Sequence, residues 1–301
     1  MKQNQKSFYE RLSILTNSER KIIYGLPKFG NLERKKFFDL EKIEKDIVHK
    51  KLNGINSKIY FILQLGYFKF SRKFFKFSFH ETLEDIQYIV EKYFPEQSLG
   101  DIKQDCNRKT IFHHQSIILK LFSSRFPTKK DREALFKKAK SVVSIDANPK
   151  YIFKEIVRFT SENKIILPAY STIQKLISKA IIASEQELFA NLKNLMDDDL
   201  IGNINILLEK ESKYRYQLTL IKAPPQSFSK KQAANERNKQ ELLEPIFKKA
   251  KEILKQVDVS NLSIKYFAEL VDRYTIQNLQ RFDDFKKYFY ILCFVYYRYI
   301  K

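Results

Sequence analysis

Two clusters in this sequence consist of residue types that bind metal ions, Asp197-Asp198-Asp199 and His113-His114. Neighbouring carboxylates on a helix point in different directions, whereas a two-metal nuclease collects its carboxylates from separate elements. The histidine pair has no second Cys or His pair at ligand spacing, so the pattern does not support a zinc site. We expect a solvated helix end at the aspartates and a phosphate contact or a packed side chain at the histidines. Neither a metal nor a cofactor is predicted.

The motifs of common enzymes are also missing from the sequence. It has no Gly-rich phosphate loop and no Gly-x-Ser-x-Gly turn. Cys106 and Cys293 are the only cysteines, which is too few for a disulfide scaffold and fits a reducing cytosol. The first residues, MKQNQKSFYERLS, contain no apolar signal core. We therefore predict a cytoplasmic protein without enzyme activity.

The charge of the chain points to a polyanionic partner. Fifty-six Lys and Arg residues face 35 Asp and Glu, giving a formal net charge of +21. Residues 1–76 hold 18 basic and seven acidic side chains, a local net charge of +11. Such an excess suits nucleic acid or an acidic membrane surface.

One apolar segment, Asn56–Phe70, must help to position these charges. Its residues Ile59, Ile62, Leu63, Gly66, Tyr67 and Phe70 recur at helical spacing, and the opposite side is also apolar. We expect a helix that is buried on most of its circumference. The segment is too short, and too charged at its ends, to span a bilayer, which needs about 20 apolar residues.

Further helices are predicted around this segment. Thr16 or Asn17 would cap a first helix that ends near Tyr24, and Asp39 precedes a helix over 40–52. That helix and the one from Asn56 could form a helix-turn-helix, although many helical hairpins look the same. Residues 68–79 form either a short strand or an exposed loop. Additional helices are expected at 82–94, at 101–122 and after Pro127.

A second helical unit begins at Asn148-Pro149, an N-cap followed by proline at the first helical position. After Leu167-Pro168, Ser171 and Gln174 have the spacing of a capping box. The helix that follows should bury Ile173, Leu176, Ile177, Ala180 and Ile181. Its opposite face carries Thr172, Lys175, Ser178 and Lys179, which either enter a major groove or form a solvated face.

The last third of the chain is less regular. Residues 204–221 alternate enough for a β-hairpin, with a helix as the alternative, and 222–240 have a linker composition. Helices are expected over 241–256 and 264–274. The apolar segment from Asp283 has no C-cap, which suggests a chain cut short. The predicted fold is mainly α, with two to three small helical domains, helix-turn-helix-like units and one short β-hairpin as an option. The predicted boundaries are 1–126, 127–221, a linker 222–240, and a truncated third domain at 241–301.

Several motifs occur together in a recognisable order. They are Thr16-Asn17-Ser18-Glu19-Arg20 and Pro27; Asn56, Phe61, Gln64, Leu65 and Phe70; Arg108 and His113; Leu167-Pro168, Thr172 and Ile173; and Ala223-Pro224-Pro225. In this order they resemble the N-terminal DNA-binding region of the replicative transposases of the Tn-three family. Two departures concern contacts: lysine replaces arginine at Lys58 and Lys69, and Ser71-Arg72 stands where the family often has a turning glycine.

The resemblance implies sequence-specific binding of transposon terminal inverted repeats during DNA transposition. It also implies a bacterial, nucleoid-associated protein whose partner is double-stranded DNA, with a homodimer as an option for the full-length transposase. The family's metal-carboxylate nuclease site lies downstream of the matching region. The predicted DNA contacts are Lys58, Arg72, Lys73, Arg108, Lys109, His113, Thr172, Lys175, Lys179, Lys230 and Lys231.

Two alternatives remain open at this point. The abundant Tyr and Phe residues would also suit a helical interaction or dimerisation module of a transposase, or the chain would be a nonfunctional remnant. Membrane binding through residues 68–79 is disfavoured, because this segment lacks a long amphipathic helix.

Overall fold

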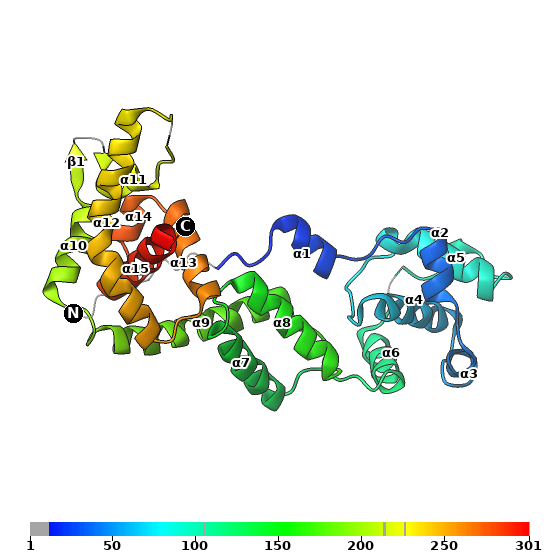
Figure 1. Ribbon diagram of the computed structural model, residues 1–301. Coiled ribbons are helices and arrows are strands. Elements are labelled where there is room, and N and C mark those ends of the chain that lie inside the picture. The colour runs from blue at the N-terminus through cyan, green and yellow to red at the C-terminus, as the bar shows by residue number, and fades with distance from the viewer. Residues whose placement is uncertain (1–11, 105, 213–214, 226, 301) are drawn as a thin grey trace, which may run out of the picture. The chain divides into compact units, whose positions relative to one another are not determined.

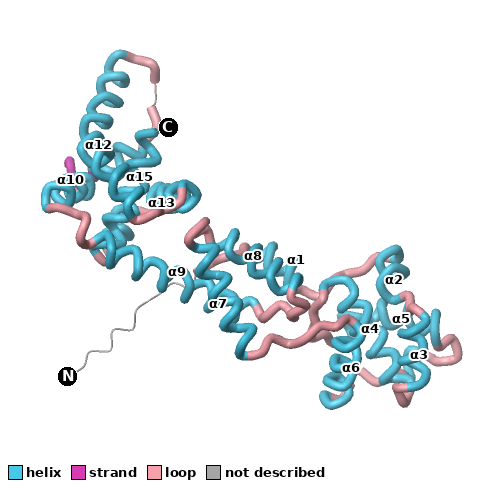
Figure 2. Tube along the Cα trace, turned by 60° about the horizontal axis from the view of Figure 1, so that its bottom comes forward, coloured by secondary structure: helices cyan, strands magenta, loops and turns pink. Residues whose placement is uncertain are grey.

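The computed structural model describes residues 12–104, 106–212, 215–225 and 227–300. These residues are 72% helical, with a two-stranded antiparallel hairpin as the only sheet within them. Figure 2 shows how small the strand portion is beside the helices. The mainly α fold and the short hairpin predicted from the sequence are confirmed. The chain divides into two compact units, residues 1–133 with 157–174 and residues 134–156 with 175–301.

The helices at the beginning of the chain belong to the first unit and are labelled in Figure 1. They are α1 (Asn17–Tyr24), α2 (Asn31–Phe38), α3 (Lys42–Lys50), α4 (Ile55–Ser71), α5 (Leu83–Tyr93) and α6 (Arg108–Leu121), with short 3₁₀ turns at His80–Thr82 and Leu99–Asp101. Three longer helices run through the division between the units: α7 (Lys129–Val143), α8 (Pro149–Glu162) and α9 (Tyr170–Leu192).

The remaining elements lie in the second unit. They are α10 (Asp198–Leu208), β1 (Lys210–Ser212), β2 (Arg215–Tyr216), α11 (Gln217–Lys222), α12 (Lys230–Gln256), α13 (Asn261–Arg273), α14 (Ile276–Gln280) and α15 (Asp284–Ile300). Lys210 pairs with Tyr216 across the hairpin.

Helix α4 is the centre of the first unit. All ten residues from Ile59 to Phe68 are buried, as its continuous apolar pattern predicts. Phe70 is the exception, with 49% of its surface exposed, so its predicted core position is wrong. Its ring still packs edge-on against Phe29 and Phe37.

Helix α2, which the sequence pattern does not predict, packs directly on α4. A Cβ atom built at Gly66 of α4 would meet the Phe38 ring at 2.2 Å, so only glycine permits this approach. The NLERKKFF sequence of α2 has almost no apolar face of its own. Contact with α4, and not local amphipathicity, therefore explains its position.

Several predicted helix starts are confirmed. The Glu19 N–H donates to Thr16 Oγ1 at 3.2 Å, while Glu19 Oε2 accepts from the Thr16 N–H at 3.0 Å, so Thr16 closes a capping box on α1. Asn148 accepts from the Lys150 N–H and caps α8. Helix α9 differs: it begins at Tyr170, before the predicted box, and Gln174 instead donates to the Leu12 carbonyl at 2.7 Å.

Other boundaries are corrected by the structure. Helix α3 is capped at Glu41 and not at Asp39, and its Ile43 is exposed. Helix α6 starts at Arg108, capped by Asn107, and not at residue 101. Of the two options predicted for residues 68–79, the loop is found at 73–78, after α4 ends at Ser71. Residues 230–240, which belong to the predicted linker, form the first turns of α12 because Ser229 accepts from the Gln232 N–H.

Helix α15 forms the core of the second unit. Its residues Tyr288–Val295 are all buried, against α12 and α13, and Figure 1 shows α15 between these helices. Lys286 and Tyr290 both bond to Glu185, each at 3.0 Å. The apolar segment from Asp283 thus packs against helices that lie earlier in the chain. Within the described residues, no helix combines the length and apolarity needed to cross a membrane.

Candidate nucleic-acid interface

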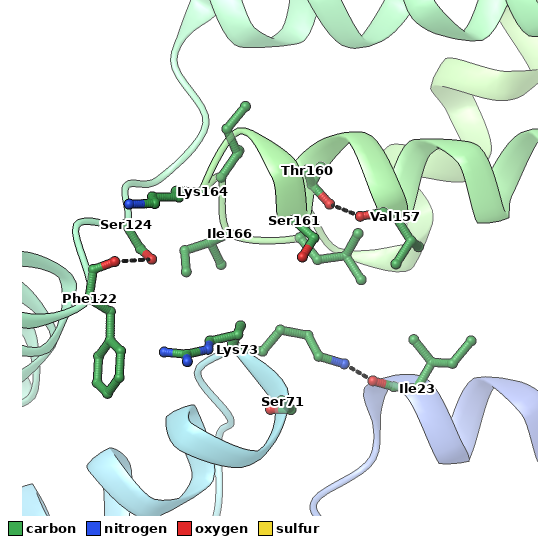
Figure 3. A pocket seen from close by; sticks show the side chains of 13 residues that line it. Ile23, Ser71, Lys73, Phe122, Ser124, Val157, Thr160, Ser161, Lys164 and Ile166 are labelled. Carbon is green, nitrogen blue, oxygen red and sulfur yellow. Dashed lines mark hydrogen bonds between the residues drawn. The ribbon is translucent and has the colours of Figure 1, made fainter.

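A cavity of about 400 Å³ in the first unit collects basic and hydroxyl side chains. Its walls come from the end of α4, the residues after α6, the last turn of α8 and the α8–α9 connection. Three cations line it, Arg72, Lys73 and Lys164, and no acidic residue lines it within the described part of the chain. We call it the cationic cavity (Figure 3).

Arg125 holds the α8–α9 connection in place beside this cavity. Its backbone N–H donates to the Lys164 carbonyl at 3.0 Å, and its own carbonyl accepts from the Ile166 N–H at 2.9 Å. Its guanidinium donates to the Asn163 carbonyl at 2.9 Å and to Asp131 at 2.6 Å. Three of these four bonds reach residues 163–166 and fix a loop that would otherwise be free to vary, while the fourth ties Arg125 to α7.

Arg72 occupies the left-handed conformation at the C-cap of α4, with φ of 55° and ψ of 33°. This is the turning position where the resembling family often has glycine, so the chain turns there without one. The guanidinium carbon lies 4.3 Å from the centroid of the Phe122 ring, a cation–π contact. Left-handed backbone costs a non-glycine residue about 1 kcal/mol, so the structure retains a strained arginine at the cavity.

Lys73 is half-buried between α4 and α1. Its amino group donates to the Ile23 carbonyl in the last turn of α1 and lies 5.1 Å from the Tyr24 ring centroid; Figure 3 shows it pointing toward Ile23. Burial lowers the pKa of Lys73 to about 8, because the partly enclosed site solvates the ammonium poorly. An anion in the cavity would compensate this charge.

Lys164 is the cavity residue that the sequence did not single out. It is exposed and left-handed, with φ of 53°, directly after α8. The sequence shows Asn163-Lys164 only as a turn between two helices, which is a common place for a solvated lysine. The turn between the two helices is the feature of the sequence that points to Lys164, because a left-handed residue at a helix C-terminus changes the direction of both the chain and the side chain.

Hydroxyl groups complete the lining of the cavity. The Ser71, Ser124 and Thr160 hydroxyls donate to backbone carbonyls, those of Tyr67, Phe122 and Val157 respectively. Two of these bonds are drawn in Figure 3, together with Ser161 on the same helical turn as Thr160. Hydroxyls can rotate to serve an anion, and cations with hydroxyls are the usual partners of phosphate oxygens.

The other predicted contacts in the first unit lie elsewhere. Arg108, Lys109 and His113 are exposed on α6, and the Arg108 guanidinium lies 5.3 Å from the centroid of the Phe112 ring. Lys58 is half-buried in the first turn of α4. None of these four lines the cationic cavity.

Helix α9 presents Thr172, Lys175 and Lys179 as exposed side chains on one face. Ile173, Ile177 and Ala180 are buried on the opposite face, as predicted. Lys230 and Lys231 are also exposed, but they lie in the first turn of α12 and not in a linker. Cations there oppose the helix dipole.

The residues that looked like metal ligands have structural roles. Asp197 caps α10 by accepting from the Leu200 N–H at 2.9 Å, and its other oxygen accepts from Lys249 at 2.7 Å. The Lys249 bond is the main cause of the lowered pKa of Asp197. His114 is buried, and burial, followed by the charge of His113, lowers its pKa to about 4. Across the described ranges, no three His, Cys, Asp or Glu residues gather as a metal site.

Lys69, one of the two lysines that replace a family arginine, is a buried structural residue. Its amino group pairs with Glu44 at 2.6 Å and donates to the Asp39 carbonyl at 2.8 Å. Both side chains of the pair are largely buried. Lys69 therefore connects α4 to α3 and to Asp39, the C-cap of α2, and is not available to a ligand.

Comparison with known families gives one match. The profile described as "Domain of unknown function (DUF4158)" covers residues 14–180, more than half of the chain, including α1, α4, α6, α8 and the start of α9. A comparison with curated proteins finds no match. The match contains the entire cationic cavity. The chain therefore belongs to the DUF4158 family, whose domain is found in transposases of the Tn-three family.

Proposed function

We propose that this chain binds double-stranded DNA, and that its target is the terminal inverted repeats of a transposon. The observation that carries this proposal is the cationic cavity, in which Arg72, Lys73 and Lys164 meet hydroxyl groups and no acidic side chain among the described residues. Its occupant is a backbone phosphate. The family membership and the net charge of +21 support the same partner.

The two kinds of contact have different roles in this proposal. The cavity binds phosphates and sets the position of the protein on the duplex without reading sequence. The face of α9 with Thr172, Lys175 and Lys179 enters the major groove, where small polar and cationic side chains reach base edges. We propose DNA binding for this chain and do not propose that it cleaves a DNA strand.

The salt dependence of binding tests the role of the cavity. A triple variant, Arg72→Gln, Lys73→Gln and Lys164→Gln, removes its three cations. A plot of the logarithm of the DNA-binding constant against the logarithm of the salt concentration has a negative slope, and each lost phosphate contact makes it shallower by about 0.9. We therefore expect the slope of the triple variant to be shallower by about two to three.

The control variant removes the same charge from elsewhere. Lys193, Lys251 and Lys255 are exposed residues of the second unit, and replacing all three with glutamine leaves the cavity intact. Fluorescence anisotropy of a labelled duplex over a salt series measures both slopes. Equal slopes for the cavity variant and the control variant would show that the cavity binds no phosphate.

A further inference from the structure

A second cavity of about 560 Å³ lies on another side of α4, between α4, the loop after it and the beginning of α6. Four aromatic residues line it: Tyr60, Phe75, Phe77 and Phe112. The Tyr60 and Phe77 rings are almost parallel, with 9° between their planes. Phe112, at the start of α6, is 54% exposed. We call this cavity the aromatic pocket.

The polar residues of the aromatic pocket are mainly of two kinds. Three are glutamines, Gln64, Gln104 and Gln115, and two are cations, Lys76 and Arg108. None of the lining residues that the structure describes is acidic. Flat apolar surfaces with amides and cations suit a planar ring that has a hydrogen-bonding edge and carries a negative charge nearby.

One of these amides lacks a full set of partners. Gln64 is 5% exposed, and its Nε2 lies 3.2 Å from His114 Nδ1, while His114 Nε2 lies 2.9 Å from Ser57 Oγ. Gln64 Oε1 has no hydrogen-bond partner within the described part of the chain. Turning the amide round would satisfy the oxygen and leave the nitrogen without a partner. A buried amide in this state is unusual, because nearly all such groups are paired.

Gln64 is also one of the residues that line the pocket. His114 stays neutral at physiological pH, since burial lowers its pKa to about 4. It therefore holds the Gln64 amide through one ring nitrogen without adding charge.

We propose that the aromatic pocket binds an unpaired nucleobase of the DNA that the first unit holds. The base stacks on the aromatic side chains, its edge bonds to the Gln64 amide, and Arg108 and Lys76 contact the adjoining phosphate. This inference rests on the proposed function, because it requires DNA as the partner. A base already unpaired enters most easily, since extruding a paired base costs a few kcal/mol.

Three labelled duplexes of the same sequence test this proposal: one fully paired, one with a single extra adenine in one strand, and one with an abasic analogue of that adenine. We expect the intact chain to bind the bulged duplex about tenfold tighter than the paired duplex, as stacking of one base provides. The abasic duplex should show no such gain. Replacing the extra adenine with 2-aminopurine gives a second readout, because its fluorescence should fall on stacking.

Two variants test whether the preference for the bulged duplex depends on the aromatic pocket. Phe112→Ala removes an exposed aromatic wall, and Gln64→Leu removes the amide at similar volume. The matched control is Phe126→Ala, since Phe126 is also in the first unit and 47% exposed but does not line the pocket. Phe112→Ala and Gln64→Leu should lose the preference for the bulged duplex, and Phe126→Ala should keep it.

The possible failures can be told apart. Equal binding of all three duplexes would overturn the base-binding role and leave DNA binding intact. A bulge preference that survives in both pocket variants would overturn it as well. Failure to bind any duplex at low salt would overturn the proposed function together with this inference.

Discussion

The three cations of the cationic cavity are Arg72, Lys73 and Lys164. Each of them carries a cost in the free protein: Arg72 and Lys164 adopt left-handed backbone, and Lys73 is a lysine whose pKa is lowered by burial. A fold selected for stability alone would favour glycine at the two left-handed positions and an apolar side chain at Lys73. Their coincidence at one cavity is the pattern expected of a binding site.

The titration of Lys73 gives a pH dependence of DNA binding. In the free protein Lys73 loses its proton near pH 8, and a bound phosphate favours the protonated form. Above pH 8 binding therefore requires the uptake of a proton, and affinity falls by up to about tenfold per pH unit. Anisotropy titrations from about pH 7 to about pH 9.5 measure this fall.

The control for this prediction is Lys73→Met, which keeps the apolar stem and removes the charge. It should bind more weakly at neutral pH and show a flatter pH profile. An equally steep pH profile in Lys73→Met would show that the proton taken up on DNA binding belongs to another group.

The substitution Lys164→Gly should change the stability and the DNA affinity of the protein in opposite directions. Glycine adopts φ of 53° without strain, so we expect the free energy of unfolding to rise by up to about 1 kcal/mol in urea denaturation, while DNA affinity falls. Lys154→Gly, at an exposed position inside α8, should instead lower stability by about 1 kcal/mol and leave affinity unchanged. A loss of stability in Lys164→Gly would show that this backbone is not strained.

At the scale of the elements, local signals predicted helices well where the signal was strong. The apolar run of α4, the Thr16 cap and the Asn148-Pro149 start are all found as predicted. Helix α2 and the first turns of α12 were missed because their sequences have little apolar periodicity, so their helical state depends on caps and tertiary contacts. The burial of α15 was also missed, since its partners lie elsewhere in the chain.

The packing of α2 on α4 can be tested at Gly66. Gly66→Ala would place a Cβ atom 2.2 Å from the Phe38 ring, and such overpacking costs about 1–3 kcal/mol. Gly202 is a matched control, because it lies inside α10 and a Cβ atom there would meet no other atom within 4 Å. Gly202→Ala should raise stability by about 0.5–1 kcal/mol through helix propensity. Urea denaturation of both variants checks the contrast, and a neutral Gly66→Ala would contradict the close contact.

At the scale of the whole molecule, the sequence predicted a basic, mainly helical protein but not the grouping of its basic residues. Arg72 and Lys73 were named from their charge, yet the cavity also needs residues 160–167, which are distant in the sequence. The glutamines of the aromatic pocket were not singled out for binding, because a buried unpaired amide is visible only in three dimensions. The division into two units also interleaves segments that are far apart in the chain.

The most direct test of the central claim compares two duplexes at physiological salt. One carries the proposed target, a terminal inverted repeat of a Tn-three family transposon, and the other has the same bases in scrambled order. Specific binders typically prefer their site by about 10³-fold or more, so we expect a ratio of that size in an anisotropy titration. Equal affinity for the two duplexes, or no binding to either at low salt, would contradict the claim that this chain recognises transposon ends.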